Sequence, residues 1–250
     1  MKTYLSELFS SIQGEGPYIG EKHLFVRFCE CHRKCIFCDT DTQRTKTCMV
    51  QMNSKEVEYI ENPMSIDVLL ELILKIEKNN KNKKISLTGG EPLLQKKFLN
   101  KFLPRLIDNN KKIYLETAGD LPQHLESVIE WIDIAAVDIK LSSVTNEKNK
   151  FPLHWQFLKC LSDYNIEFFT KIIISDNTDE SELMYAANGI KKYAGKNNLL
   201  ILQPMSLTDK VSDIPKIENI IKWQEKLDTV LENVRAVSYT HLRAHETFGY

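Results

Sequence analysis

Short apolar segments alternate with amphipathic segments along this chain of 250 residues, and the alternation restricts the folds it can adopt. Short apolar strands separated by amphipathic helices are typical of parallel βαβ units. Both a barrel-like arrangement and an open, doubly wound sheet satisfy this pattern. The expected strands are residues 23–28, 84–87, 113–116, 134–139, 168–174, 199–202 and 234–237, and the expected helices are residues 66–77, 95–108, 123–131, 153–162, 180–193 and 217–231.

Distinctive polar residues and glycines follow the ends of these expected strands. Three cysteines follow the first strand, Gly89 and Gly90 follow the second, and Glu116 ends the third. Lys140 follows the fourth strand, and Gln203 follows a later one. In both candidate folds the chemistry takes place at the carboxyl ends of the parallel strands. The positions of these residues therefore suit a functional role.

The cysteines form a Cys-x3-Cys-x2-Cys pattern in one short loop, at Cys31, Cys35 and Cys38. Ordinary [4Fe–4S] clusters have four cysteine ligands, so a loop that offers three leaves one iron open to another ligand. A structural zinc site would instead need a fourth protein ligand. Candidates for that ligand are Cys29, His32 and Cys48. On spacing alone, both kinds of metal site stay open.

Composition excludes several classes of protein. Apolar residues make up 42% of the chain, charged residues make up 27%, and the formal net charge is −1, as in an ordinary globular protein. A charge near zero gives no global attraction to nucleic acid or to an anionic membrane. No apolar run has the length of a bilayer span, and the N-terminal segment lacks the apolar core of an export signal. We therefore expect a cytoplasmic protein whose cysteines are thiols or metal ligands.

The segment Thr-Gly-Gly-Glu-Pro, which contains Gly89, Gly90 and Glu91, joins the second strand to a helix. Glycine lacks a Cβ atom, so a ligand can approach the backbone closely there. A bare Gly-Gly pair is also common in a tight turn between a strand and a helix. The segment and the cysteine triplet together are more specific than either alone, and they favour the cluster over zinc.

Two charged residues could bind parts of a nucleotide-like ligand. Glu116 could accept hydrogen bonds from two ribose hydroxyls, as acidic residues do in other nucleotide sites. Lys140 could pair with a carboxylate of a ligand. A surface acid and a plain salt bridge explain the two residues equally well.

The segment before the first strand contains Gln13, Gly14, Glu15 and Gly16. Glycines on both sides of Glu15 indicate a backbone that wraps against another group. The Glu15 carboxylate could accept hydrogen bonds from the N–H groups of a heterocycle. A glycine-rich turn with no ligand is the simpler explanation of the segment taken by itself.

Two further residues lie next to the cysteine loop. Arg27, in the first strand, offers a bidentate fork for a carboxylate. Thr40 is an oxygen donor that could complete a Mg2+ shell shared with a substrate. Taken singly, an ion-paired strand arginine and a helix-capping threonine are the simpler explanations.

Taken together, the motifs SSIQGEGPYIG, FVR, CxxxCxxCDT, TGGEP and LETAG resemble those of the 7-carboxy-7-deazaguanine synthase family, within the radical S-adenosylmethionine (SAM) superfamily. The resemblance runs from about residue 5 to Val237 and is concentrated in the first 140 residues. It implies an α/β fold, a partial, modified TIM-like barrel of the radical SAM type with mostly parallel strands. It also implies one radical SAM domain over residues 1–237.

The resemblance further implies a reaction and its participants. The substrate would be 6-carboxy-5,6,7,8-tetrahydropterin, and the ring contraction to 7-carboxy-7-deazaguanine would release ammonia in 7-deazapurine (queuosine) biosynthesis. The implied cofactors are a [4Fe–4S] cluster, SAM and Mg2+. The implied partners are a one-electron donor such as flavodoxin or ferredoxin and a second copy of the chain in a homodimer.

Site roles can be carried over only onto residues that match the family motifs. Cys31, Cys35 and Cys38 would hold the cluster, and Thr40 would contact Mg2+. The substrate would be bound by Gln13, Gly14, Glu15, Gly16 and Arg27, and SAM by Gly89, Gly90, Glu91, Glu116, Lys140 and Gln203.

The chain departs from the family at several positions. Glu30 stands where a glycine usually precedes the first cluster cysteine, and His32 and Arg33 replace a more usual Asn-Leu pair. Cys29 is an extra thiol, either a spare ligand or a strand-end thiol. Residues 238–250 differ from the usual family ending, and we expect them to be a non-native tail that is poorly ordered or mispacked and that impairs activity.

Two other functions fit parts of the pattern. A glycyl-radical activase would share the cluster and the Gly-Gly-Glu-Pro segment, but not the Gln-Gly-Glu-Gly segment or Arg27. A zinc-stabilised module without catalysis would share only the cysteines. An assay with the carboxytetrahydropterin separates the first alternative, and metal analysis separates the second.

Overall fold

A computed structural model describes residues 1–38, 40–53, 55–79, 82, 84–107, 109, 111–205 and 215–237 of the chain. The chain divides into two compact units. The first consists of residues 1–32, 40–117 and 123–135, and the second of residues 33–39, 118–122 and the chain from residue 136 onward. The expected non-native tail, residues 238–250, lies outside the described residues.

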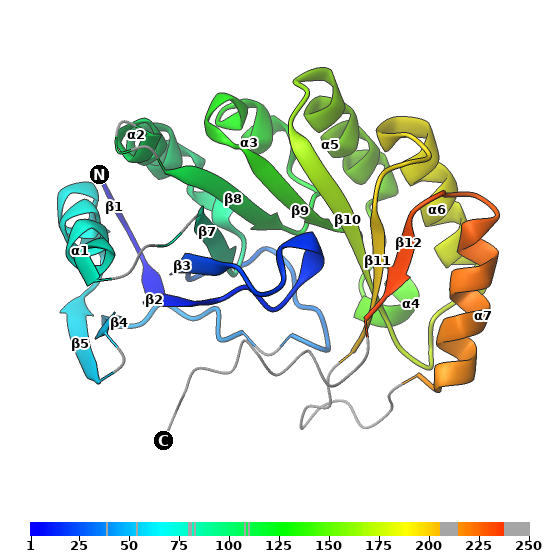
Figure 1. Cartoon of the computed structure of the whole chain (residues 1–250), viewed down its shortest axis with the longest axis horizontal. Helices are drawn as coiled ribbons and strands as arrows, with labels where there is room; N and C mark the ends of the chain where they lie inside the picture. The colour runs from blue at the N-terminus through cyan, green and yellow to red at the C-terminus, as the bar shows by residue number, and fades with distance from the viewer. Residues whose placement is uncertain are drawn as a thin grey trace. The chain divides into compact units, whose positions relative to one another are not determined.

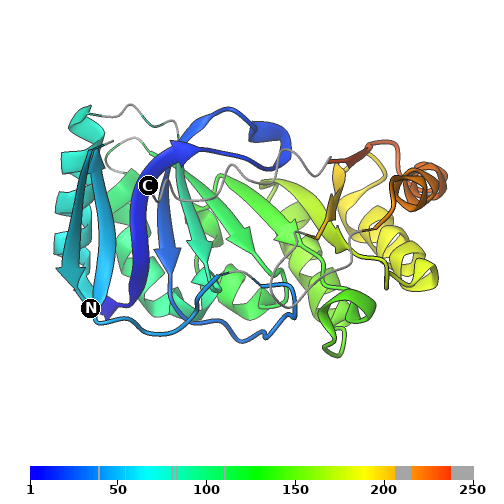
Figure 2. The same ribbon diagram turned by 90° about the horizontal axis from the view of Figure 1, so that it is seen from below.

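The first unit is built on a sheet with the strand order β8-β7-β3-β2-β4-β5. The pairs β3/β7, β7/β8 and β2/β4 are parallel, and the pairs β2/β3 and β4/β5 are antiparallel. Figure 2 shows these strands as a row with helices behind them. The strands are β2 (Leu5–Ile12), β3 (Lys22–Phe28), β4 (Thr47–Asn53), β5 (Glu56–Glu61), β7 (Lys84–Gly89) and β8 (Lys112–Thr117), and a separate antiparallel pair is formed by β1 (Lys2–Thr3) and β6 (Met64–Ser65).

Helices of the first unit connect the parallel strands. Helix α1 (Ile66–Asn79) begins after Ser65, whose Oγ accepts a hydrogen bond from the Val68 amide at 3.3 Å, as expected of an N-cap. Helix α2 (Lys96–Ile107) buries Phe98, Leu99 and Phe102 on its apolar face. The expected helix over residues 123–131 is split into α3 (Pro122–Glu126) and the short 3-10 helix η3 (Ile129–Trp131).

Two parts of the first unit were not expected. The expected strands and helices leave residues 48–63 unassigned, but β4 and β5 form an antiparallel hairpin there. Cys48, Val50 and Met52 alternate as the buried side of β4, and the apolar Met49 between them hides the two-residue period. Strand β2 was not expected either, because its sequence mixes serine and glutamate with the buried Leu5, Leu8 and Phe9.

The second unit contains the parallel strands β10 (Glu167–Ile174), β11 (Leu200–Pro204) and β12 (Val234–Ala236). Figure 1 shows α5, α6 and α7 along one side of these strands. Helix α6 begins at an N-cap, Asp179, whose carboxylate accepts hydrogen bonds from the amides of Ser181 and Glu182. The helices are α4 (Ser142–Thr145), α5 (Phe151–Asp163), α6 (Glu180–Ala194) and α7 (Ile217–Asp228).

The expected α/β class with mostly parallel strands is confirmed. All seven expected strands are present within a few residues of their expected ends, including β9 (Ile134–Asp138), which the boundary between the two units crosses. Within the described parts of the chain, no helix is both long and apolar enough to cross a membrane.

Candidate active site

The cysteines fall into two classes according to burial. Cys31 and Cys35 are partly exposed and Cys38 is exposed, and none of these three cysteines, which lie in the loop that follows β3, forms a disulfide. The other three cysteines are buried thiols of the two cores: Cys29, Cys48 and Cys160. Only the predicted triplet is therefore accessible to an incoming metal, and three thiols within eight residues are a donor set that suits a [4Fe–4S] cluster.

The extra cysteine beside the triplet belongs to the core. Cys29 is fully buried, and desolvation raises the pKa of its thiol. Burial also raises the pKa of Cys48 to about 12. Two of the three candidates for a fourth zinc ligand, Cys29 and Cys48, are therefore buried, neutral thiols.

Burial affects one thiol of the triplet as well. Desolvation raises the pKa of Cys35 to about 11, although the nearby Lys140 ammonium acts in the opposite direction. Metal binding to this thiol has to displace its proton. No three Cys, His, Asp or Glu side chains among the described residues already stand as a metal-binding group. Metal ligation therefore has to draw the side chains of the loop together.

The Gly89-Gly90 turn packs against the backbone that leads into the cysteine loop. Gly89 has a φ of +105°, and the Gly90 amide donates a hydrogen bond to the Phe28 carbonyl oxygen at 2.9 Å. A Cβ atom on Gly90 would lie 2.0 Å from the Glu30 carbonyl oxygen. Glycine is therefore required here by the neighbouring backbone of the protein, whether or not a ligand is also present.

Glu30 itself has an unusual backbone conformation. Its φ is +70°, in the left-handed region that favours glycine. The Glu30 carboxylate pairs with Arg44 at 2.8 Å and accepts a hydrogen bond from Gln95 at 3.2 Å. These two contacts favour a glutamate at a position where the family that the motifs resemble usually has glycine.

Glu91 lies inside the first unit. Its carboxylate is fully buried and accepts hydrogen bonds from the Leu93 amide at 3.1 Å and from the Thr117 hydroxyl at 3.0 Å. The first bond caps the 3-10 helix η2 (Pro92–Gln95), and the second ties the turn to the end of β8. Glu91 therefore fixes the turn after β7 relative to β8.

Two predicted site residues of different roles contact each other directly. The Gln13 side-chain amide donates a hydrogen bond to Oε1 of Glu116 at 3.0 Å, and the Thr88 hydroxyl donates to Oε2 at 2.6 Å. The Glu15 amide in turn donates to the side-chain oxygen of Gln13 at 3.0 Å. Gln13, which is fully buried, thus links the segment that contains Gly14, Glu15 and Gly16 to the end of β8.

The Arg27 side chain forms an ion pair with a residue of the neighbouring strand β2. Its Nε lies 2.7 Å from a carboxylate oxygen of Glu7, the residue opposite it in the β2/β3 ladder, and its guanidinium lies over the Phe9 ring. Thr40 is half-buried and follows the cysteine loop. The roles of Arg27 and Thr40 in ligand binding stay predictions.

The second unit holds the remaining predicted residues. Lys140 Nζ lies 2.8 Å from a carboxylate oxygen of Asp138 and 5.0 Å from the centroid of the Phe37 ring. Lys171 approaches the same Asp138 oxygen at 3.7 Å. Gln203 is buried on β11, opposite Ile173 of β10.

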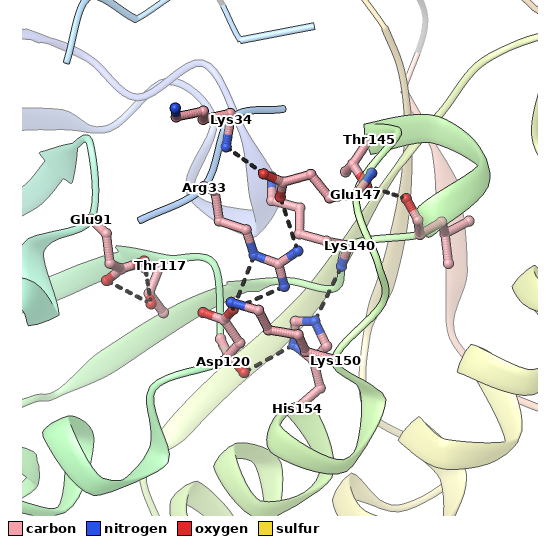
Figure 3. A network of polar contacts seen from close by, with 12 residues as sticks. Arg33, Lys34, Glu91, Thr117, Asp120, Lys140, Thr145, Glu147, Lys150 and His154 are labelled. Carbon is pink, nitrogen blue, oxygen red and sulfur yellow. Dashed lines mark hydrogen bonds and ion pairs between the residues drawn. The ribbon is translucent and has the colours of Figure 1, made fainter. Parts of the chain in front are cut away.

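A buried polar network lies around the cysteine loop in the second unit, and sequence reasoning did not find it (Figure 3). Arg33, two residues before Cys35, donates to Oδ2 of Asp120 at 3.0 Å, and Lys150 lies 3.1 Å from the same oxygen. Glu147 lies on the other side of Arg33 at 3.3 Å. The one available signal was Arg33 in place of an apolar residue, and its partner lies 87 positions away.

His154 connects this network to Lys140. Its Nδ1 lies 2.9 Å from the Gly119 carbonyl oxygen, and its Nε2 accepts a hydrogen bond from the Lys140 amide at 3.5 Å. These partners require the neutral imidazole with the proton on Nδ1. Burial lowers the pKa of His154 to about 4, which keeps the imidazole in that form.

Comparison with known proteins identifies the superfamily and a set of close relatives. Residues 26–185 match the Radical SAM superfamily. A 7-carboxy-7-deazaguanine synthase of Geobacter sulfurreducens is 32% identical over 244 residues, which cover 95% of this chain and 95% of the relative. A protein of the same name from Methanopyrus kandleri is 30% identical and covers 74% of this chain and 73% of its own length.

The fold is similar to that of a solved structure. The crystal structure of QueE from Escherichia coli superposes with a TM-score of 0.62 at 18% identity, over 94% of this chain and 93% of that one. At this identity the likeness concerns the fold alone. It confirms the α/β fold of the radical SAM type that the motifs implied.

Proposed function

Because the chain belongs to the Radical SAM superfamily and, within it, to the 7-carboxy-7-deazaguanine synthases, we propose that it converts 6-carboxy-5,6,7,8-tetrahydropterin to 7-carboxy-7-deazaguanine with loss of ammonia. It would act as a carbon–nitrogen lyase in the biosynthesis of queuosine and other 7-deazapurines. One observation carries the proposal: the match to a named synthase extends over 95% of both chains.

The superfamily implies a [4Fe–4S] cluster and SAM, and the residues present fit the cluster. Cys31, Cys35 and Cys38 would hold three of its iron atoms, because they are the accessible thiols of the described chain. When bound, the cluster and SAM would supply one-electron radical chemistry at the substrate. The residues of the chain position the reactants and exclude water.

For SAM we propose contacts with Gly89, Gly90, Glu91, Glu116, Lys140 and Gln203. The fixed turn after β7 supports this proposal, because Gly90 is hydrogen-bonded to Phe28 and Glu91 is hydrogen-bonded to Thr117. Glu116 would accept hydrogen bonds from ribose hydroxyls with a carboxylate that Thr88 already orients.

For the pterin we propose contacts with Gln13, Gly14, Glu15, Gly16 and Arg27. The hydrogen bond between the Glu15 amide and Gln13 supports a shared role, because it holds the two residues together. Arg27 contacts Glu7 through Nε, and a bidentate contact with the pterin carboxylate would use the terminal nitrogens of the guanidinium.

Several further features belong to the proposal. Thr40 would contribute an oxygen ligand to Mg2+. A low-potential donor such as flavodoxin or ferredoxin would reduce the cluster, and the protein would act as a cytoplasmic homodimer. Residues 1–237 would form one radical SAM domain, and residues 238–250 would be a non-native tail whose replacement by a family-like ending raises turnover.

The decisive experiment is anaerobic turnover with dithionite, SAM and the carboxytetrahydropterin. We expect a deazapurine product from the reconstituted protein, and iron with sulfide rather than zinc on metal analysis. The substitution Cys35→Ala should abolish SAM cleavage, and Cys160→Ala, a change at a buried thiol of α5, should retain it. SAM cleavage without a deazapurine would favour a different radical SAM activity, and a colourless zinc protein would refute the proposal.

A further inference from the structure

The cysteine loop is connected to the second unit through a buried arginine. The Arg33 side chain is 2% exposed and the Asp120 side chain is 0% exposed. Nε of Arg33 lies 3.0 Å from Oδ2 of Asp120, and Nη2 lies 2.9 Å from the same oxygen. Lys150 also reaches this oxygen, at 3.1 Å, so the Asp120 carboxylate meets two cations (Figure 3).

A second carboxylate completes the connection from the solvent side. One oxygen of Glu147 lies 3.3 Å from Nη1 of Arg33, and the other accepts a hydrogen bond from the Lys34 amide at 2.6 Å. Two cations, Arg33 and Lys150, thus face two anions, Asp120 and Glu147. We call these four residues the Arg33 clamp.

The rest of the loop has weaker attachments within this unit. The Ile36 amide donates to the Thr145 carbonyl oxygen at 3.4 Å, and the Phe37 ring contacts Lys140. The Cys38 amide donates to the Cys35 carbonyl oxygen at 3.1 Å, which is a bond inside the loop. Among the contacts that the described residues of the loop make with this unit, the charge-assisted bonds of the Arg33 clamp are therefore the strongest.

Net stabilisation of the fold is a poor explanation for such a group. Desolvation of buried ions offsets much of their attraction, and apolar replacements of buried ion pairs are often neutral or stabilising. A buried ion pair can instead select one conformation, because a displaced loop would leave charges without partners. This effect is local to the segment that carries the arginine.

We propose that Arg33 is a positioning residue of the cluster loop. Its bonds to Asp120 and Glu147 hold the backbone of residues 33–38 in place before the cluster is assembled, so that only the side chains of Cys35 and Cys38 have to move when iron arrives. The second half of this inference rests on the proposed function, because it assumes that these cysteines bind a cluster. The first half, that Arg33 holds residues 33–38 in place, concerns the cluster-free chain alone.

Hydrogen exchange of the cluster-free protein tests the first half. We expect Arg33→Leu to increase amide exchange of peptides covering residues 34–38 by about tenfold, with β7 and β8 unchanged. The matched control is Lys159→Leu, which breaks an exposed ion pair with Asp163 in α5 of the same unit and should leave the loop unaffected. If the amide exchange of the loop is unchanged, or if exchange increases equally throughout the chain, the Arg33 clamp does not hold the loop in place.

Anaerobic reconstitution with iron and sulfide tests the second half. We expect the cluster to assemble more slowly in Arg33→Leu than in the unmodified chain. Arg33→Lys should partly restore the rate, because lysine keeps the charge but lacks the forked guanidinium. Cluster absorbance and iron content measure the assembly. Normal assembly in a chain with a deprotected loop would overturn this half. Failure of the synthase assay alone would leave both measurements intact and would refute only the proposed function.

A second variant keeps the test informative if Arg33→Leu does not fold. Glu147→Ala removes the partly exposed carboxylate and leaves the Arg33–Asp120 pair in place. It should increase exchange of the Lys34 amide, which loses its acceptor, and slow cluster assembly relative to the unmodified chain. No change in exchange at Lys34 would contradict the clamp.

Discussion

The carbonyl oxygen of Glu30 lies 2.0 Å from the position that a Cβ atom on Gly90 would occupy. The Glu91 amide donates a hydrogen bond to this same oxygen at 2.9 Å, so the two backbone segments are in direct contact. Glu30 immediately precedes the first cysteine of the loop, and Gly90 belongs to the turn after β7. The conformation of the loop entrance therefore depends on the absence of a side chain at residue 90.

Gly90→Ala should destabilise the protein by about 3 kcal/mol and reduce cluster retention, because the obstacle is backbone that cannot swing aside. The control is Gly195→Ala, where a Cβ atom meets nothing within 4 Å and only the φ of +89° is unfavourable. That substitution should cost about 1 kcal/mol and leave cluster content unchanged. Urea unfolding and iron analysis of both variants provide the check, and equal effects at the two sites would contradict the close approach.

Glu30→Gly should be more stable than Glu30→Ala by about 1 kcal/mol, because the φ of +70° suits glycine and strains alanine. Both variants lose the same two contacts, to Arg44 and Gln95, so their difference isolates the backbone conformation. Denaturant unfolding of the two purified variants measures it. An alanine variant as stable as the glycine variant would show that residue 30 is not left-handed in solution.

Mild acid should destabilise the fold through two buried histidines. Desolvation lowers the pKa of His154 from 6.5 to about 4 and the pKa of His23 from 6.5 to about 4. Between pH 6.5 and about 4 the two histidines bind protons in the unfolded chain but not in the folded chain. Their contribution to the free energy of unfolding is therefore fully present above pH 6.5 and is lost as the pH falls toward 4. Each histidine should account for about 3 kcal/mol.

Urea unfolding at several pH values tests this expectation. The free energy of unfolding should fall steadily from about pH 6.5 to about pH 4.5, and His154→Gln should flatten the slope by about half. A free energy that stays constant over this interval would mean that both imidazoles are protonated freely in the folded state.

Thr88→Val should weaken SAM binding by about tenfold without changing iron content, because it removes the hydroxyl that donates to Glu116 at 2.6 Å. The matched control is Thr170→Val on β10, whose hydroxyl donates to Asn198. Equilibrium dialysis of SAM on anaerobically reconstituted protein gives the affinities. If the two valine variants bind SAM equally well, Thr88 does not orient Glu116 for this ligand.

The parallel part of the fold was predictable because its strands are short, apolar and bounded by helices. Strands β7, β8 and β10 all have this pattern, and each was expected within two residues of its ends. Strand β5 was not predictable, because it lies at the edge of its sheet and none of its six residues belongs to the buried core; Val57 and Tyr59 are exposed on it. Edge strands lack the burial that gives a sequence its period.

The candidate site was predictable where a motif combines unusual residue types within a short stretch. The cysteine triplet and the glycine pair are examples, and the structure gives a physical reason for Gly90 that the sequence could not supply. The partners of these residues were not predictable. The contact of Gln13 with Glu116 spans 103 positions, and the contact of Arg33 with Asp120 spans 87, so only the folded chain brings them together.

The bond between Gln13 and Glu116 has a thermodynamic consequence if the two residues serve different ligands. If either side chain turns toward an incoming molecule, the hydrogen bond between the two side chains changes. Occupancy at one end of the pair then changes the affinity at the other end, and the change is the same size in both directions. In an enzyme with this coupling, the binding of one reactant would change how tightly the other reactant is bound.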